Sequence, residues 1–389
     1  MAGWAMKVLQ IHSHYRIAGG EDTVVANEAR LLKQAGHQVW QYFEPNPFEP
    51  AKALMATLAS PWNPLSERQL TRRLRAERPD IAHVHNTWFR LSPSIYRALE
   101  RAEVPVVRTL HNYRSFCIEG QTYRDGGSCT DCLDGPLPGL RHSCYRSLPL
   151  SVVATGAQLS HRLSGADRSV KKFVAPSEFM RDLVVRGGIP AEKTIVKPHF
   201  SYDPGERPMP PSASNQVVVL GRLAPGKGVD LLLQAWAQLP KGHGLQLLVA
   251  GDGPSGEELR RTAPAGVEFA KLASDEVHTR LLGARALVFP SMLNETFGLV
   301  VVEAMAAGLP VVGFDVAGIS EILGDLSSDC LVDSGDVSGL GKKLTDLRSG
   351  SFVDSNGAAN RLRYLDCYTP EAQLPLLEAV FKDVVDARK

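Results

Sequence analysis

Short apolar runs alternate with helix-length segments along the whole sequence, and this alternation is what most constrains the fold. In the first half the runs are MKVLQIH, GHQVWQYF, DIAHVH, VPVVRTLH and KKFVAPS. In the second half they are QVVVLG, LQLLVAG, VEFA, ALVFPS and PVVGFD. Continuous apolar runs of this length are typical of parallel strands covered by helices on both faces. The pattern therefore predicts an α/β fold, with helices expected over Asp22–Gln34, Val229–Leu239 and Phe297–Ala307.

The two series of runs are separated by a stretch that is rich in proline and serine and has little periodicity, which indicates a linker over residues 201–215. At 389 residues the chain is also too long for one ordinary core. We therefore expect two Rossmann-like domains that face each other across a cleft, over residues 1–200 and 216–365. The last segment, 366–389, has helical spacing, and we expect it to pack back towards the N-terminal domain.

The net charge of +1 is the sum of two unequal halves. Residues 1–200 hold 26 Lys and Arg against 18 Asp and Glu, which is +8, and the remainder holds 17 against 24. A basic half suits an anionic substrate or an anionic membrane surface, although solvated Arg-rich helices explain much of it. With no long apolar segment and no secretory signal, we expect a cytoplasmic protein, with peripheral contact at the inner membrane face left open.

Four of the six cysteines lie close together in the sequence, in a loop over residues 117–144. Eleven residues separate each outer cysteine from a central C-x-x-C pair. A tetrahedral thiolate site would accept this spacing and would fix the loop, so structural zinc is one interpretation, with free thiols or a redox pair as the alternatives. The candidate ligands are Cys117, Cys129, Cys132 and Cys144.

Two glycine-containing turns follow strands of the second half. In GRLAPGKG, Arg222 and Lys227 lie five positions apart after Gly221, so both cations can point at one phosphate or diphosphate. In GDGPSG, residues 251–256 match G-x-G-x-x-G only formally, because Pro254 interrupts the pattern and the strand before it is not the first of its domain. A tight turn between strand and helix is the better interpretation of the second motif.

A third stretch, NETFGLVVVEAMAAG, places Glu295 in a loop and Glu303 nearly two turns into a helix. Backbone N–H groups of Gly298, Leu299 and Val300 would point out of the helix N-terminus and attract a phosphate. The two glutamates could contact opposite ends of one extended polar ligand. The structural alternative is a capped amphipathic helix in which Glu303 pairs with a basic residue.

Taken together, these motifs resemble the retaining, nucleotide-sugar-dependent glycosyltransferases of family four, which belong to the group 1 type and have the GT-B fold. The resemblance rests on GRL…KG, G-D-G-P and the E-x7-E block with its EAMAAGLPVV tail, and it extends to AGISEIL and LVDSGD. In the first half, GHQV, PDIAHVHN, VPVVRTLHN and VAPSEFMRDLV are similar to the same family in order and spacing. HNYRSFC with the cysteine loop resembles a branch associated with cell-surface polysaccharide assembly.

The resemblance implies a role for each matching residue of the second domain. The two cations of GRLAPGKG would neutralise the donor diphosphate as it leaves, Glu303 would accept hydrogen bonds from the ribose, and Glu295 would hold hydroxyls of the transferred sugar. The segment after the VEFA run would border the nucleobase. The resemblance thus implies catalytic roles in this domain for Arg222, Lys227 and Glu295, to which the first domain adds His111. The donor-binding residues of this domain are Gly221, Lys271, Leu272, Phe297, Gly298, Leu299, Val300 and Glu303.

In the first domain, the resemblance implies that Gly19 and Gly20 form a turn over the donor phosphates. It also implies that His111 lines the reaction centre, and His85 and Asn86 are further candidates for the cleft. No Asp-x-Asp occurs in the sequence, which agrees with catalysis that needs no metal or other cofactor.

The expected function is transfer of a sugar from a UDP- or GDP-sugar to a glycan, a lipid-linked or glycolipid acceptor, or a small molecule, in polysaccharide or glycoconjugate synthesis. No nucleic-acid partner is expected. The nearest alternatives are a nucleotide-sugar 2-epimerase of the same fold and a non-catalytic sugar-nucleotide-binding protein. A glycosidase using the two glutamates is less compatible with the cations, and a nicotinamide dehydrogenase lacks the required first-strand glycine turn.

Overall fold

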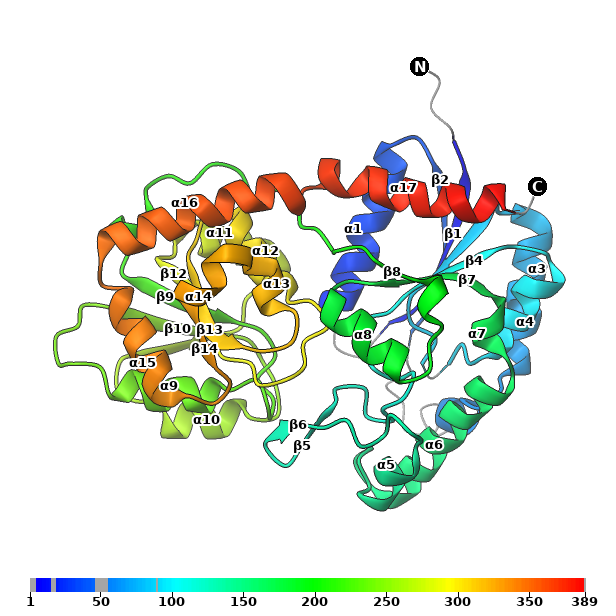
Figure 1. Ribbon diagram of the computed structural model, residues 1–389, viewed down its shortest axis with the longest axis horizontal. Coiled ribbons are helices and arrows are strands. Elements are labelled where there is room, and N and C mark those ends of the chain that lie inside the picture. Colours follow the sequence, from blue (N-terminus) through cyan, green and yellow to red (C-terminus); the bar gives the residue numbers. More distant parts are fainter. Residues whose placement is uncertain (1–4, 15–18, 46–54, 89, 388–389) are drawn as a thin grey trace. The chain divides into compact units, whose positions relative to one another are not determined.

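The computed structural model describes residues 5–14, 19–45, 55–88 and 90–387, and its backbone divides into two compact units (Figure 1). The first unit is formed by described residues of the ranges 1–122, 129–198 and 373–389, and the second by 123–128 and 199–372. The linker expected over 201–215 thus belongs to the second unit, where the guanidinium of Arg285 donates to the carbonyl oxygens of Ser212 and Ser214 at 2.7 and 2.8 Å.

The first unit is built on a six-stranded sheet of order β2-β1-β3-β4-β7-β8, in which every neighbouring pair is parallel. Helices connect consecutive strands, as parallel pairing requires. The strands are β1 (Lys7–His14), β2 (Gln38–Pro45), β3 (Ile81–Val84), β4 (Val106–Thr109), β7 (Val170–Ala175) and β8 (Thr194–Val196). The helices are α1 (Gly20–Gln34), α3 (Pro64–Glu77), α4 (Ser94–Arg101), α5 (Leu137–Arg141), α6 (Leu148–Leu163), α7 (Ala166–Ser169), α8 (Glu178–Arg186) and the short η1 (Ala191–Lys193).

The second unit repeats this architecture with a parallel sheet of order β11-β10-β9-β12-β13-β14. Its strands are β9 (Gln216–Leu220), β10 (Gln246–Ala250), β11 (Val267–Ala270), β12 (Ala286–Phe289), β13 (Val311–Asp315) and β14 (Leu331–Asp333). Its helices are α9 (Val229–Ala237), α10 (Gly256–Thr262), α11 (Ser274–Gly283), α12 (Leu299–Ala306), α13 (Ile319–Leu323), α14 (Ser327–Cys330), α15 (Val337–Asp346) and α16 (Gly350–Cys367), with short turns at η2 (Pro211–Ala213) and η3 (Gly324–Leu326).

The chain ends in α17 (Pro370–Asp386), most of which belongs to the first unit. Its apolar side chains, among them Leu377 and Phe381, are buried in one cluster with Val8 of β1 and Ile81 of β3. The ring nitrogen Nε2 of His37 also lies 2.9 Å from a carboxylate oxygen of Glu378. The final helix is therefore part of the core of the first unit.

The α/β class and the parallel sheets are confirmed, and each apolar run singled out in the sequence overlaps one observed strand. The alternation did not reveal the three-residue strands β8 and β14, which lie at sheet edges. It also did not reveal the antiparallel hairpin of β5 (Tyr123–Arg124) and β6 (Gly127–Ser128) inside the cysteine loop. Runs of two or three residues are too short to carry a periodic signal.

Candidate functional site

Three loops of the second unit meet at the carboxyl edge of its sheet, where open α/β sheets bind ligands. They follow β9, β10 and β12 and are joined by backbone hydrogen bonds. The N–H of Leu223 donates to the carbonyl oxygen of Asp252 at 2.9 Å, and the N–H of Met292 donates to that of Gly226 at 2.8 Å. The motifs GRLAPGKG, GDGPSG and NETFG thus form one continuous surface.

Glycines allow these loops to approach one another at backbone distance. Gly228 has φ of 64°, and a Cβ atom built on it would lie 1.8 Å from the carbonyl oxygen of Pro290. Gly253 has φ of 158°, and its Cβ would lie 2.2 Å from the carbonyl oxygen of Leu223. G-D-G therefore serves as a tight packing turn here, in agreement with the interpretation favoured from the sequence.

The structure brings two of the proposed site residues into direct contact. The Nζ atom of Lys227 donates to Oε1 of Glu295 at 2.5 Å, and Oγ of Ser291 donates to the same oxygen at 2.7 Å. Arg222 lies on the same loop as Lys227 with its side chain exposed, and no residue in the described ranges forms an ion pair with it. Lys227 is thus held by a carboxylate, whereas Arg222, five positions earlier in the same loop, is exposed to solvent.

Helix α12 begins where the loop after β12 ends. Its N-cap is Gly298, with φ of 97°, and no side chain caps the first turn, so Leu299 and Val300 present backbone N–H groups at the helix N-terminus. Phe297 precedes it as a buried anchor, with its ring 5.2 Å from that of His199 and 6.1 Å from that of Tyr368. The helix starts two residues later than the sequence predicted.

Glu303 lies within α12 in a strongly desolvated position. Burial raises the pKa of its carboxyl to about 7. Within the part of the chain that the structure describes, no hydrogen-bond or ion-pair partner of this carboxyl is found, so the structural alternative of a basic partner is not borne out. An acid that stays costly to ionise in the ligand-free protein is a frequent sign of a functional position.

Lys271 and Leu272 follow β11 at the same sheet edge. Lys271 is exposed, and its Nζ atom lies 2.9 Å from a carboxylate oxygen of Asp252 in the G-D-G turn. Leu272 is half-buried against the core of the second unit. The two residues therefore border the surface formed by the three loops.

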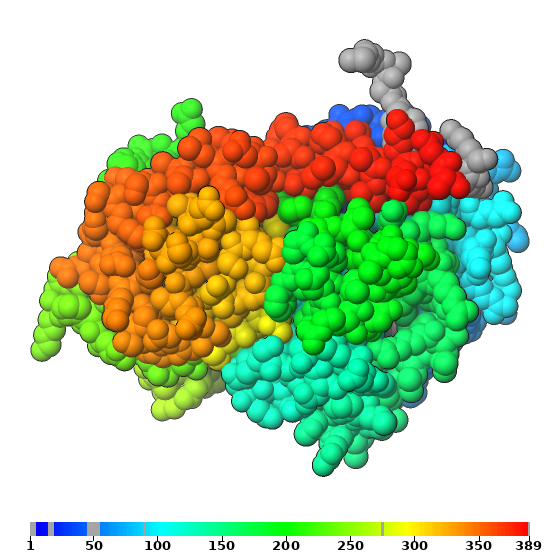
Figure 2. Space-filling view, in the orientation of Figure 1, coloured from blue at the N-terminus to red at the C-terminus, as the bar shows by residue number. Residues whose placement is uncertain are grey.

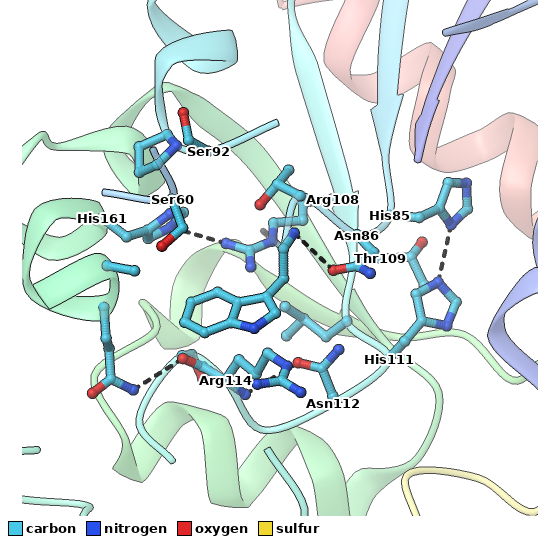
Figure 3. Close-up of a pocket in the computed structure, with 17 residues that line it drawn as sticks. Ser60, His85, Asn86, Ser92, Arg108, Thr109, His111, Asn112, Arg114 and His161 are labelled. Carbon is cyan, nitrogen blue, oxygen red and sulfur yellow. Dashed lines mark hydrogen bonds between the residues drawn. The ribbon is translucent and has the colours of Figure 1, made fainter. Parts of the chain in front are cut away.

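In the first unit, histidines gather at the carboxyl edge of β1, β3 and β4. Nδ1 of His85 and Nε2 of His111 share a hydrogen bond of 3.0 Å, as Figure 3 shows. Asn86 is also buried there, and its Nδ2 donates to the carbonyl oxygen of Ser13 at 2.9 Å. The structure thus joins His111 to His85, and it places Asn86 next to His85 at the end of β3.

A buried charge pair that sequence reasoning missed lies behind these histidines. Nζ of Lys197 is 3.3 Å from Oε1 of Glu28, whose other oxygen is 3.6 Å from Nδ1 of His83 and 3.8 Å from Nε2 of His85. Burial lowers the pKa of His83 to about 4, so this ring is neutral near pH 7. One signal was available, because Glu28 falls on the apolar face of α1 between Val24 and Leu32.

This arrangement favours one tautomer of His111. A carboxylate beside Nε2 of His85 favours a proton on that nitrogen, so that Nδ1 accepts a hydrogen bond from Nε2–H of His111. His111 then keeps the lone pair on its own Nδ1. The chain from Glu28 through His85 to His111 therefore orients the His111 ring at the sheet edge.

Gly19 and Gly20 lie at the N-terminus of α1, both exposed, with no heavy atom within 4 Å of the position a Cβ would take. A carboxylate oxygen of Asp22 accepts from the N–H of Gly19 at 3.0 Å. Its other oxygen lies 2.9 Å from Nε2 of His12 and 2.7 Å from Nδ1 of His14. The start of α1 is thus fixed by a hydrogen-bonded Asp–His group that the sequence motifs did not indicate.

A polar pocket of about 40 Å³ opens beside His85 and His111 (Figure 3). The guanidinium of Arg114 lies over the ring of Trp88, 4.9 Å from its centroid. Further inside, Nη1 of Arg108 lies 3.0 Å from a carboxylate oxygen of Asp167. Burial of the Asp167 carboxyl acts to raise its pKa, but His161 and then Arg108 outweigh this and hold the pKa below its usual range. Aromatic and guanidinium planes of this kind suit a small polar group near His111.

The four cysteines of the loop over 117–144 are free thiols, and Cys132 is buried among them. Burial, together with the smaller effects of the neighbouring Cys117, Cys144 and Cys129, raises the pKa of the Cys132 thiol to about 11. In the described ranges, three possible ligand atoms lie within 4.8 Å of one another only at His12, His14 and Asp22 and at Glu28, His83 and His85. The cysteines are thus close together but more widely spaced than that, and zinc binding stays a prediction.

Comparisons with known protein families match both halves of the chain. Residues 18–200 match the family described as Glycosyltransferase Family 4, and residues 214–349 match the one described as Glycosyl transferases group 1. D-inositol 3-phosphate glycosyltransferase of Mycobacterium tuberculosis is 31% identical over 278 residues, which are 65% of this chain and 50% of that protein. The chain therefore spans about half the length of the curated relatives that it matches.

Solved structures show the same fold at low sequence identity. Sucrose-phosphate synthase from Thermosynechococcus elongatus matches with a TM-score of 0.70 and 17% identity, covering 98% of this chain and 99% of the other. Anabaena HepE in complex with UDP and glucose matches with a TM-score of 0.66 and 18% identity, covering 96% and 99%. These likenesses extend over both units and show the fold of GT-B glycosyltransferases.

Proposed function

The chain belongs to the group 1 glycosyltransferases of family four, and on that premise we propose that it transfers a sugar from a UDP- or GDP-sugar to an acceptor hydroxyl with retention of configuration. The observation that carries this proposal is the contact between Lys227 and Glu295 beside the N-terminus of α12. It combines a cation and a helix N-terminus, suited to a diphosphate, with a carboxylate suited to sugar hydroxyls.

The donor's diphosphate is proposed to lie against Arg222, Lys227 and the backbone N–H groups that follow Phe297. Breaking the bond between the sugar and the phosphate builds negative charge on the leaving oxygen. Fixed cations and a helix N-terminus stabilise that charge without a metal ion. The loop glycine Gly221 and the turn at Gly19 and Gly20 leave space for phosphate oxygens, because none of them carries a side chain.

The ribose and the transferred sugar of the donor are assigned to the two glutamates, and the nucleobase is assigned to the residues that follow β11. Glu303 accepts hydrogen bonds from the ribose hydroxyls, and its raised pKa marks a carboxyl that gains most from such donors. Glu295 exchanges part of its contact with Lys227 for hydroxyls of the transferred sugar. Lys271 and Leu272 border the nucleobase.

In the reaction, the acceptor hydroxyl attacks the anomeric carbon on the face from which the diphosphate departs. The bond from the anomeric carbon to the phosphate oxygen breaks as the new glycosidic bond forms, and the departing phosphate oxygen takes the acceptor's proton. His111 lines this reaction centre as a hydrogen-bonding group, oriented through His85. The acceptor is a glycan, a lipid-linked sugar or a small molecule of cell-surface polysaccharide or glycoconjugate synthesis.

The test is to screen UDP-, GDP- and dTDP-sugars for thermal protection and then for transfer. A donor present at about 100 times its dissociation constant stabilises the protein by about 2.7 kcal/mol, which a melting curve resolves. The anomeric configuration of the product, read by NMR, shows whether it is retained. A 2-epimerase would instead convert the donor in the absence of any acceptor, and a binding protein would show protection with no turnover. Either result would overturn the proposal.

A further inference from the structure

Helix α6 has its larger apolar side chains on the solvent side. The residues that it buries are small or polar, namely Ser151, Ala154, Thr155, Ala157 and Gln158. The leucines and valine at positions 148, 152, 159 and 163 are instead 40% to 85% exposed. Because a surface helix normally turns its apolar face to the core, this helix is reversed.

The exposed apolar side chains lie on one side of α6. At about 100° per residue, Leu148, Val152, Leu159 and Leu163 fall within a sector of about 60° on the helix surface. The stripe runs the full length of α6, about 22 Å at 1.5 Å per residue. The neighbouring α5 packs against α6 and adds Leu137, which is also exposed. We call these five residues the α6 stripe.

The sequence segment that holds the stripe, residues 135–166, carries only positive formal charge. Between Asp134 and Asp167 there is no acidic residue, whereas Arg141, Arg146 and Arg162 all lie in this interval and are exposed. Asp167 itself is held by Arg108 and His161. Figure 2 shows the segment around α5, coloured teal, at the molecular surface. The stripe is thus flanked by arginines at the start of α6 and near its end.

We propose that the α6 stripe docks the first unit onto the surface of an anionic lipid bilayer. An apolar helix face with arginines at its borders matches the two requirements of an interfacial helix, namely apolar area for the acyl boundary and cations for the headgroups. The absence of acidic side chains from residues 135–166 favours a uniformly anionic surface over a protein partner of mixed charge. In the described ranges, no helix has the length and apolar character needed to cross a membrane, so α6 would lie in the interface plane.

The location of α6 connects this surface with the pocket beside His111. Ala157 and Gln158, on the inner side of the helix, line that pocket. Nε2 of Gln158 also donates to the carbonyl oxygen of Arg114 at 3.0 Å. The same short helix therefore contacts the pocket on one side and presents leucines on the other. Membrane docking does not depend on the proposed reaction, because no residue of the α6 stripe is assigned to donor binding or catalysis.

The experiment is co-sedimentation of the full chain with phosphatidylcholine vesicles, with and without phosphatidylglycerol. The wild-type protein is expected to sediment with the anionic vesicles only, and less so at high salt. The double variant Val152→Asp, Leu159→Asp is expected to bind at least tenfold more weakly. Replacing Arg141, Arg146 or Arg162 singly by Gln should weaken binding about fivefold each at low salt, the factor that corresponds to about 1 kcal/mol per cation.

The matched control is Leu362→Asp, Leu365→Asp on α16, where two leucines are similarly exposed on the other unit. It should bind vesicles as the wild type does. All variants should keep the wild-type melting temperature, because the substituted side chains lie at the surface. Failure of the wild type to bind anionic vesicles, or equal binding by the stripe variant, would overturn the proposal. So would a concentration-dependent dimer that the stripe variant abolishes, since a second copy would then be the occupant.

Discussion

The Nζ atom of Lys227 and the Oε1 atom of Glu295 form a 2.5 Å ion pair that joins the loop after β9 to the loop after β12. Each residue was assigned to a different part of the donor, the cation to the diphosphate and the acid to the sugar. Their contact means that the ligand-free protein neutralises both groups with each other. When a donor binds, the Lys227–Glu295 contact must therefore weaken, so that Lys227 can bind the diphosphate and Glu295 can bind the sugar of the same ligand.

Replacing either member of this pair should remove activity and leave stability nearly unchanged. Lys227→Ala and Glu295→Ala are each expected to lower kcat by about 10² to 10³, the loss typical for one group that stabilises developing charge. The pair is partly exposed, so the free energy of unfolding should change by no more than about 1 kcal/mol. Turnover assays measure the loss of kcat, and urea unfolding measures the change in the free energy of unfolding. Full turnover by either variant would contradict the assignment.

Glu303 should make stability fall as the pH rises. Its folded pKa of about 7 lies above the usual 4.5, so the folded state keeps a proton that the unfolded state releases between these values. Stability is therefore fully present below about pH 4.5 and is lost up to about pH 7, by about 3 kcal/mol. Glu303→Gln should match the wild type at pH 5 and exceed its stability at pH 8.

The same variant should bind UDP more weakly at pH 8, because it lacks the carboxylate proposed to accept the ribose hydroxyls. Isothermal titration calorimetry of UDP at pH 8 checks this, and inorganic pyrophosphate serves as a control ligand without ribose. An equal loss of affinity for UDP and for pyrophosphate would show that Glu303 does not bind the ribose.

Local sequence patterns predicted the strands and the loops that follow them, because apolar runs and glycine turns act over a few residues. They also predicted that Arg222 and Lys227 would share one loop. They did not predict the Glu28–Lys197 pair, whose members lie 169 positions apart and meet only when α1 and the end of β8 pack together. The reversed face of α6 was equally hidden, since spacing identifies an apolar stripe but not the side on which the sheet lies.

The stability losses from mutating Glu28 and Lys197 should not be additive. Glu28→Gln leaves Lys197 buried without a counter-charge, and Lys197→Met does the same to Glu28, so each should cost about 3 to 5 kcal/mol of stability. The double variant removes both charges and should be more stable than either single variant. Urea unfolding of the three proteins measures this coupling. Strictly additive losses would show that the two charges do not depend on each other.

The same variants test the orientation of His111. Without the carboxylate of Glu28, neither tautomer of His85 is favoured electrostatically, so the bond from His111 should weaken. The double variant should then show lower kcat with an unchanged KM for the donor, whose contacts are assigned to the second unit. The ¹⁵N chemical shifts of the His111 ring report its tautomer directly. An unaltered tautomer in these variants would show that the Glu28–Lys197 pair does not control the orientation of His111.

Gly228 should tolerate no side chain. Its left-handed backbone alone disfavours alanine by about 1 to 2 kcal/mol, and the new Cβ would also meet the carbonyl oxygen of Pro290. Gly228→Ala should therefore separate the loops after β9 and β12 and remove protection by UDP-sugars. Gly283→Ala is the matched control in the same unit, because no heavy atom lies within 4 Å of its Cβ position. Retained donor protection in the Gly228 variant would show that the loop contact is dispensable.

The cysteine loop should hold one zinc ion per chain if its four thiols are the ligands. Elemental analysis of the purified protein is then expected to give about one equivalent, and the Cys132→Ser variant less than half of that. Because the thiols are spaced more widely than a closed site, binding must draw the loop together. Chelation should therefore increase proteolysis between residues 117 and 144. If the purified protein contains no zinc and all four thiols can be alkylated, the zinc prediction is wrong.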